Sequence, residues 1–154
     1  MKNEEITDSY YKKAVEKLGE ATLQDKDVWY SHILNLPEHL QVTYTVIIVD
    51  QQVFNGGFHQ YFFNSYGQFA YLTIDNLRLI GAFKAADILE RATNLVNADQ
   101  ISLNEFRRKV FDRDFSKVVD FDDELFDALS ALDDEYYALE ENLEQLLVDY
   151  LSNQ

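Results

Sequence analysis

Apolar residues recur every three or four positions along most of the chain, which is the spacing of an amphipathic helix. In the first such stretch Ile6, Tyr10, Ala14 and Leu18 form one apolar stripe, and charges of both signs occupy the other positions. Similar patterns predict helices over residues 4–20, around 28–33 within 23–36, over 70–80, over 82–96 on the far side of Gly81, and over 102–111 behind a Ser102 cap.

The stretch that follows Pro37 gives conflicting local signals. We expect Pro37 at the first position of a helix, with Glu38 after it. Residues 42–49 are almost all β-branched, which favours a strand. However, residues 46–49 form a continuous apolar block without alternation, and helical spacing persists from Leu40 to Phe54. We therefore predict a buried helix here.

Residues 54–71 hold eight aromatic side chains with amides between them. We expect residues 55–57 to end the buried helix, residues 58–64 to form a short helix, and Gly67 to stop it. One interpretation is a tight helical turn whose amides satisfy free backbone groups. The other is a groove for a peptide or small ligand, formed by Asn55, Gly56, Gly57, Phe58, Gln60 and Asn64.

The C-terminal part has the most regular apolar pattern. Steps of four and three residues connect Leu125, Leu129, Leu132, Tyr136, Leu139, Leu143, Leu146 and Tyr150. This spacing predicts one helix, or two helices that meet near Asp133, packed on the core of the same chain. Asp120 or Asp122 is expected to cap its start.

Composition agrees with a helical fold. The chain has 154 residues, 47% of them hydrophobic, with five glycines, one proline and no cysteine. This length fits one domain, and scarce glycine and proline favour long helices over a turn-rich β fold. We predict an all-α fold, a single-domain helical bundle of about six to eight helices.

The net charge of −15 is concentrated at one end. Residues 111–154 hold 2 Lys and Arg against 14 Asp and Glu, a balance of −12. Such a surface repels bare nucleic acid and attracts a basic protein, although an acidic face can also serve solubility alone. Residues 107–109 are the one basic cluster; it is expected to be a solvated face, or to meet the acidic end of a second copy in a homodimer.

No residue pattern indicates catalysis, a metal or a cofactor. His32, His39 and His59 lack the spacing of metal ligands. A calcium loop counted from Asp120 would need Gly and Glu where Leu125 and Ala131 stand. We expect no enzyme activity, although a site assembled from distant residues is a rival possibility. With no apolar run of membrane-spanning length or signal-like start, we expect a cytoplasmic protein that binds no membrane.

Several motifs resemble one known family. They are residues 53–58 with Gln60-Tyr61-Phe62, Asn64 and Gly67, then Ile80-Gly81-Ala82, residues 132–137 and Tyr150-Leu151. Together they resemble the hallmark of the DNA-mimic protein family, a bacterial domain otherwise of unknown function with an NGGF-x-QYF-x-N block, over about residues 35–151. The resemblance implies an all-helical fold. It also implies an acidic protein that occupies the DNA-binding face of a transcription factor or similar protein.

Charge spacing adds to this hypothesis. If residues 133–149 were one helix, their seven acids would lie about 3.6 Å apart along the axis, close to the roughly 3.4 Å of one DNA strand. We therefore expect a basic DNA-binding protein as the partner. The acids expected to mimic phosphates are Asp120, Asp122, Asp123, Asp127, Asp133, Asp134, Glu140, Glu141 and Glu144.

Overall fold

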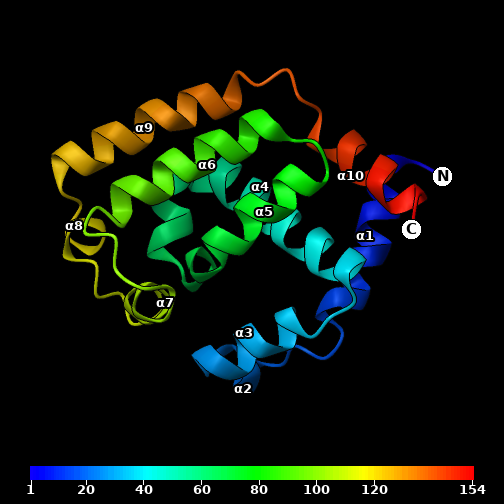
Figure 1. The fold of residues 1–154 in the computed structure, drawn as a ribbon, viewed down its shortest axis with the longest axis horizontal. Helices are drawn as coiled ribbons and strands as arrows, with labels where there is room; N and C mark the ends of the chain where they lie inside the picture. Colours follow the sequence, from blue (N-terminus) through cyan, green and yellow to red (C-terminus); the bar gives the residue numbers. More distant parts are fainter.

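Helix is the only regular secondary structure in the computed structural model, which describes residues 1–154 (Figure 1). The elements are α1 (Asn3–Val15), α2 (Glu20–Leu23), α3 (Lys26–Leu34), α4 (Glu38–Phe63), η1 (Ser65–Phe69), α5 (Ala70–Leu79), α6 (Phe83–Val96), α7 (Leu103–Phe111), α8 (Ser116–Val119), α9 (Asp123–Tyr137) and α10 (Leu143–Ser152). Because α2 and α8 have only four residues each, eight α-helices of nine residues or more remain. The prediction of an all-α domain is confirmed.

The long helix α4 organises the others. Helices α1, α5, α9 and η1 all pack against it, and α6 lies between α5 and α9. Helix α10 packs against α1, so the two termini lie close together (Figure 1). Helix α9 forms one edge of the molecule, while α2 and α3 lie at the opposite side (Figure 1). None of these helices has the length and apolar character needed to cross a membrane.

The β-branched residues after Pro37 are helical, as predicted. Val42, Val46 and Val49 are almost completely buried in a core cluster of 33 residues. The hydroxyl groups of Thr43 and Thr45 donate to the carbonyl oxygens of His39 and Gln41, at 2.7 and 3.0 Å. Burial on several sides explains the continuous apolar run, because a helix surrounded by other helices has no solvent face to keep polar.

Helix α4 breaks at its two glycines. Gly56 has φ −156° and ψ 16°, and Gly57 has φ +77° and ψ −178°, so the chain changes direction between two helical halves. The left-handed φ of Gly57 confirms the expected turn. The second half ends at Asn64, whose backbone is extended, and not at Gly67, which lies inside η1.

Three other predicted boundaries differ from the structure. Helix α1 ends at Val15 and not near residue 20, because Gly19 is extended and starts the short helix α2. The C-terminal helices do not meet near Asp133; α9 continues to Tyr137, and α10 begins after Asn142, whose side chain accepts from the backbone N–H of Gln145 at 3.0 Å. Pro37 precedes the first helical residue by one position.

Candidate functional site

Three aspartates form a straight row on the exposed side of α9. Asp123, Asp127 and Asp134 are all exposed, and none forms a hydrogen bond or ion pair with another side chain. At about 100° per residue they lie within about 40° around the helix, and Asp123 and Asp134 are about 16 Å apart along its axis. We call Asp123, Asp127 and Asp134 the carboxylate row.

The opposite face of α9 fixes this row in place. Leu125, Leu129, Leu132 and Tyr136 are buried against α4 and α6, so the aspartates must face solvent. The Asp122 side chain caps the helix by accepting from the backbone N–H of Leu125 at 3.0 Å. The capping prediction is therefore confirmed for Asp122. Asp120 ends α8 instead and is exposed.

Asp133 has a structural task that its sequence position did not reveal. Its carboxylate accepts from the backbone N–H of Phe58 at 2.7 Å, and so caps the second half of α4 next to the Gly57 kink. Burial raises the pKa of the Asp133 carboxyl, and the hydrogen bond from Phe58 opposes that rise. This aspartate is turned toward α4 and is a poor candidate for contact with a partner.

Glu141 is also committed within the fold. It lies between α9 and α10, and its two carboxylate oxygens accept from the backbone N–H groups of Lys84 and Ala85 at 3.1 and 2.9 Å. These contacts cap α6, whose own N-terminal residue Ala82 offers no side-chain cap. Glu140 beside it is exposed and has no such contact.

The expected row over residues 133–149 is therefore wrong in its geometry. Residues 138–142 are not helical, so these acids do not continue along one axis. Glu135 forms a two-point ion pair with Arg91 at 2.7 and 3.1 Å, and Asp133 and Glu141 cap other helices. Of the nine predicted contact acids, six are exposed without a partner: Asp120, Asp123, Asp127, Asp134, Glu140 and Glu144.

The predicted amide groove is occupied by its own side chains. Asn55 donates to Gln60 at 3.4 Å, and Gln60 and Asn64 both donate to the amide oxygen of Gln52 at 3.2 and 2.9 Å. Gly57 and Phe58 are buried, while Gly56 is exposed. The amides thus stabilise the kink of α4.

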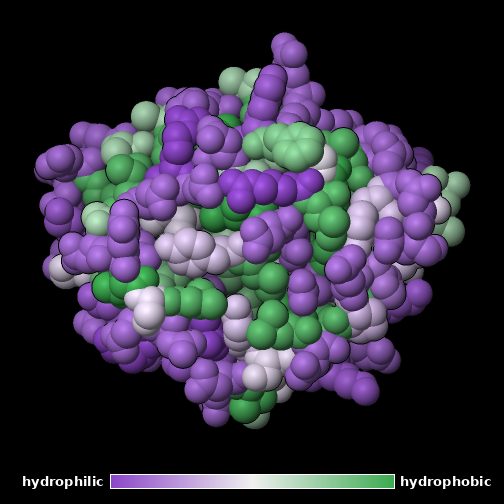
Figure 2. Space-filling view, in the orientation of Figure 1, coloured by the Kyte–Doolittle hydropathy of each residue, from purple (hydrophilic) through white to green (hydrophobic).

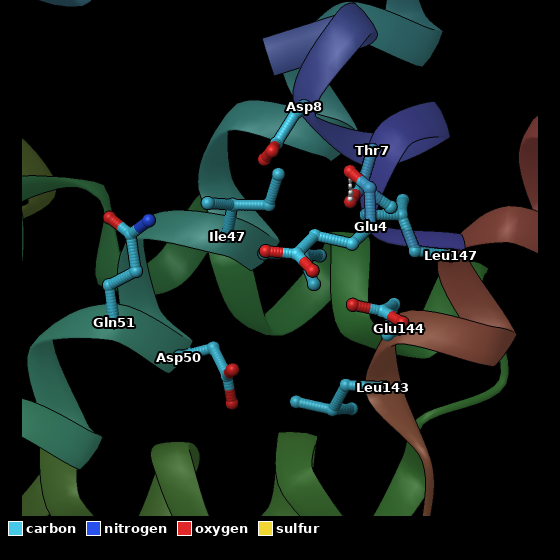
Figure 3. A pocket seen from close by; sticks show the side chains of 10 residues that line it. Glu4, Thr7, Asp8, Ile47, Asp50, Gln51, Leu143, Glu144 and Leu147 are labelled. Carbon is cyan, nitrogen blue, oxygen red and sulfur yellow. Dashed lines mark hydrogen bonds between the residues drawn. The ribbon is translucent and has the colours of Figure 1, made fainter. Parts of the chain in front are cut away.

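A hollow does exist between α1, α4 and α10 (Figure 3). Four carboxylates surround it, from Glu4, Asp8, Asp50 and Glu144, and no Lys or Arg lines it. Asp50 accepts from the phenol of Tyr136 at 2.6 Å, and burial raises the pKa of this carboxyl while that hydrogen bond opposes the rise. A second hollow shares Asp50 and Glu144 and extends to Phe54 and Tyr137.

The histidines and the basic cluster have internal contacts. A ring nitrogen of the buried His59 lies 2.8 Å from the carbonyl oxygen of Val118, and one of His32 lies 3.3 Å from that of Ala14. Arg107 is buried over the Tyr30 ring at 3.6 Å, so the expectation of a solvated face fails for this residue. Arg108 pairs with acids of its own region.

A model of the family described as DMP19-like protein matches residues 34–154. The chain belongs to the DMP19-like protein family. No curated protein and no solved structure matches it. The assignment to a DNA-mimic protein family with an NGGF-x-QYF-x-N hallmark is therefore corrected, because the matching family is DMP19-like and the match identifies no such motif. Membership suggests a protein of DNA-mimic type.

Sequence reasoning missed the internal tasks of Asp133 and Glu141, because both depend on contacts far away in the chain. One signal was available for the free acids. Asp123, Asp127 and Asp134 share the helix face opposite Leu125, Leu129 and Leu132, and this can be read from residue spacing alone.

The family match from residue 34 includes α4 to α10 and so contains the whole carboxylate row.

Proposed function

We propose that this chain is a DNA-mimic-type protein that binds the basic DNA-contacting surface of a DNA-binding protein and competes there with DNA. The observation that supports this most directly is the carboxylate row of α9. Its three charges are exposed and unpaired, while the chain has a net charge of −15. A binding role of this kind requires no reaction and no cofactor.

The charge density of the α9 surface is of the same order as that of DNA. With Glu124 included, α9 carries four free acids over about 16 Å, or one charge per about 5 Å. One strand of DNA carries one per about 3.4 Å. Asp120 and Glu140 lie just beyond the two ends of α9 and extend the charged surface. In Figure 2 the edge of the molecule along α9 is mainly hydrophilic, with a few hydrophobic residues among the polar ones.

The rigid backbone under the row favours this role. Asp122 caps α9, four apolar side chains anchor it, and Arg91 ties Glu135 to α6. Fixed charges bind more strongly than mobile ones, because less side-chain and backbone freedom is lost on association. A partner with Lys and Arg at DNA-phosphate spacing would therefore meet a preformed surface.

The test compares two variants that each remove three negative charges. One is Asp123→Asn, Asp127→Asn and Asp134→Asn, which neutralises the carboxylate row. The control is Glu16→Gln, Glu20→Gln and Asp99→Asn. These three exposed acids lie outside residues 111–154, and their side chains have no partner. No side chain in either set caps a helix or forms an ion pair, so both variants should keep the melting temperature of the parent within a few degrees.

DNA-binding proteins from the source cell, recovered on immobilised duplex DNA, are passed over this chain, and a retained protein is purified. Its binding is then measured by fluorescence anisotropy with labelled duplex DNA as competitor. We expect mutual exclusion, a loss of about tenfold or more in affinity for the row variant and less than threefold for the control, because three surface ion pairs contribute up to about 1 kcal/mol each. Simultaneous binding of DNA and this chain, or equal losses in the two variants, would refute the proposal.

A further inference from the structure

Exposed aromatic side chains accompany the carboxylate row. Phe54 is 60% exposed, Phe121 54%, Tyr137 44% and Phe126 41%. Phe54 and Tyr137 contact each other with ring centroids 5.3 Å apart, and Phe121 and Phe126 do so at 6.2 Å. Large aromatic rings exposed in groups usually mark a surface that another molecule covers. We call Phe54, Phe121, Phe126 and Tyr137 the aromatic row.

Helix α9 places the two rows beside each other. Phe126 follows Asp123 by three positions, and Tyr137 follows Asp134 by three. Residues three apart are neighbours on a helix surface. The helix therefore presents the same pair, a carboxylate with an aromatic ring next to it, twice at a separation of eleven residues or about 16 Å.

This combination suits an arginine side chain. A guanidinium group is planar, stacks on an aromatic face and donates in a fork to a carboxylate, whereas the lysine ammonium is a compact, strongly hydrated charge. The chain already contains such an arrangement. Arg107 lies 3.6 Å over the Tyr30 ring while it donates to the carboxylate of Asp27 at 3.3 Å.

A second guanidinium lies close to the aromatic row itself. The Cζ atom of Arg113 is 4.9 Å from the centre of the Phe63 ring, and the Phe63 ring is 6.1 Å from that of Phe121. An intramolecular guanidinium thus already stacks beside the end of α9 that carries Asp123. The aromatic groups here can accept a planar cation in the geometry that this fold provides.

The backbone of Phe121 supports a role outside the core. Its φ is +54°, a left-handed conformation that the chain adopts at the end of α8. There the backbone N–H of Asp122 donates to the carbonyl oxygen of Lys117 at 3.0 Å. Helices commonly end in this way on Gly or Asn, because other residues are strained there. Here the position holds a large ring that packs on the buried His59, with ring centroids 4.3 Å apart, and still leaves more than half of the residue exposed.

We propose that the partner contacts α9 with arginine side chains, each stacked on a ring of the aromatic row and paired with the adjacent aspartate. This inference rests on the proposed function. The partner surface is then arginine-rich and not simply basic. The two pairs, Asp123 with Phe126 and Asp134 with Tyr137, set a spacing of about 16 Å between two such arginines. Charge complementarity selects a cation, and the rings select arginine over lysine.

The test uses two synthetic peptides, nona-arginine and nona-lysine, and the full chain at low salt. Dissociation constants are measured by calorimetry for the parent, for Phe126→Leu with Tyr137→Leu, and for Phe83→Leu as the control. Phe83 is 66% exposed on α6, outside the aromatic row. Leucine keeps an apolar side chain and removes the aromatic face. Thermal unfolding confirms that all three proteins are folded at the temperature of measurement.

We expect the parent to prefer the arginine peptide, and the double leucine variant to reduce that preference by about three- to tenfold, in line with two lost cation–π contacts. The control should leave it unchanged. An unchanged preference in the double variant would overturn the arginine assignment. It would do so even if the variant with Asp123→Asn, Asp127→Asn and Asp134→Asn binds both peptides more weakly, as the proposed function requires. Simultaneous binding of the partner to DNA and this chain would instead overturn the proposed function, whatever the peptides show.

Discussion

Replacing Gly57 with alanine should destabilise the fold far more than the same change at Gly81 or Gly19. Gly57 has φ +77° and ψ −178°, a region that is almost restricted to glycine and costs other residues about 1–3 kcal/mol. A Cβ atom at this position would also lie 2.8 Å from Cγ of Asp133, which is too close. The Asp133 carboxylate would have to move away.

That movement would break the hydrogen bond from the backbone N–H of Phe58 to Asp133, which is 2.7 Å long. A hydrogen bond to a charged group contributes about 1.5–3 kcal/mol. Strain and hydrogen-bond loss together give about 2.5–6 kcal/mol, or a fall of about 5–24 °C in melting temperature for a chain of this size. Urea unfolding at neutral pH, followed by circular dichroism, measures the free energy directly.

Two other glycines separate the two contributions. Gly81 has φ +86° but no atom within 4 Å of an added Cβ, so Gly81→Ala should show strain alone, about 1–2 kcal/mol. Gly19 has a φ of −105° and open space, so Gly19→Ala should leave stability unchanged or raise it slightly. A Gly57→Ala cost no larger than that of Gly81→Ala would refute the argument about Asp133.

A double-mutant cycle gives a second check of the same reasoning. Asp133→Ala alone removes the hydrogen bond from Phe58, and Gly57→Ala alone is expected to remove it by displacement. The double variant should therefore cost less than the sum of the two single changes, by about the energy of that bond. Strictly additive costs would mean that Asp133 keeps its contact in the Gly57→Ala protein.

Two further predictions concern carboxylates inside the fold. Since burial raises the pKa of Asp50, the parent should lose unfolding free energy as the pH rises from about 4 through that raised pKa. Asp50→Asn should not show this loss, because an amide does not titrate in this range, and its oxygen can still accept from Tyr136. Identical pH profiles of the two proteins in urea unfolding would contradict this. Glu141→Gln should cost about 0.5–2 kcal/mol in the same assay through the weakened cap of α6, while the exposed Glu140→Gln costs less than about 0.5; equal costs would contradict the capping role.

Much of the helical framework could be predicted from residue spacing. The burial of Leu125, Leu129 and Leu132 follows from steps of four and three, and the helical state of residues 42–49 follows from the missing alternation. Ser102 and Asp122 could be identified as caps because a capping side chain bonds to a backbone group two or three residues away. These are local properties, so local sequence is sufficient to predict them.

The tertiary structure alone decided which acids are held by contacts inside the fold. Asp133 and Asp134 are adjacent and chemically identical, yet one caps α4 across 75 positions of sequence and the other faces solvent. Glu140 and Glu141 differ in the same way, because only Glu141 reaches the backbone of α6. The sequence by itself determined an acidic helical domain with a free face on α9, since periodicity and composition are local. The assignment of each carboxylate to capping, pairing or exposure required the packed helices, because long-range contacts depend on where the chain returns.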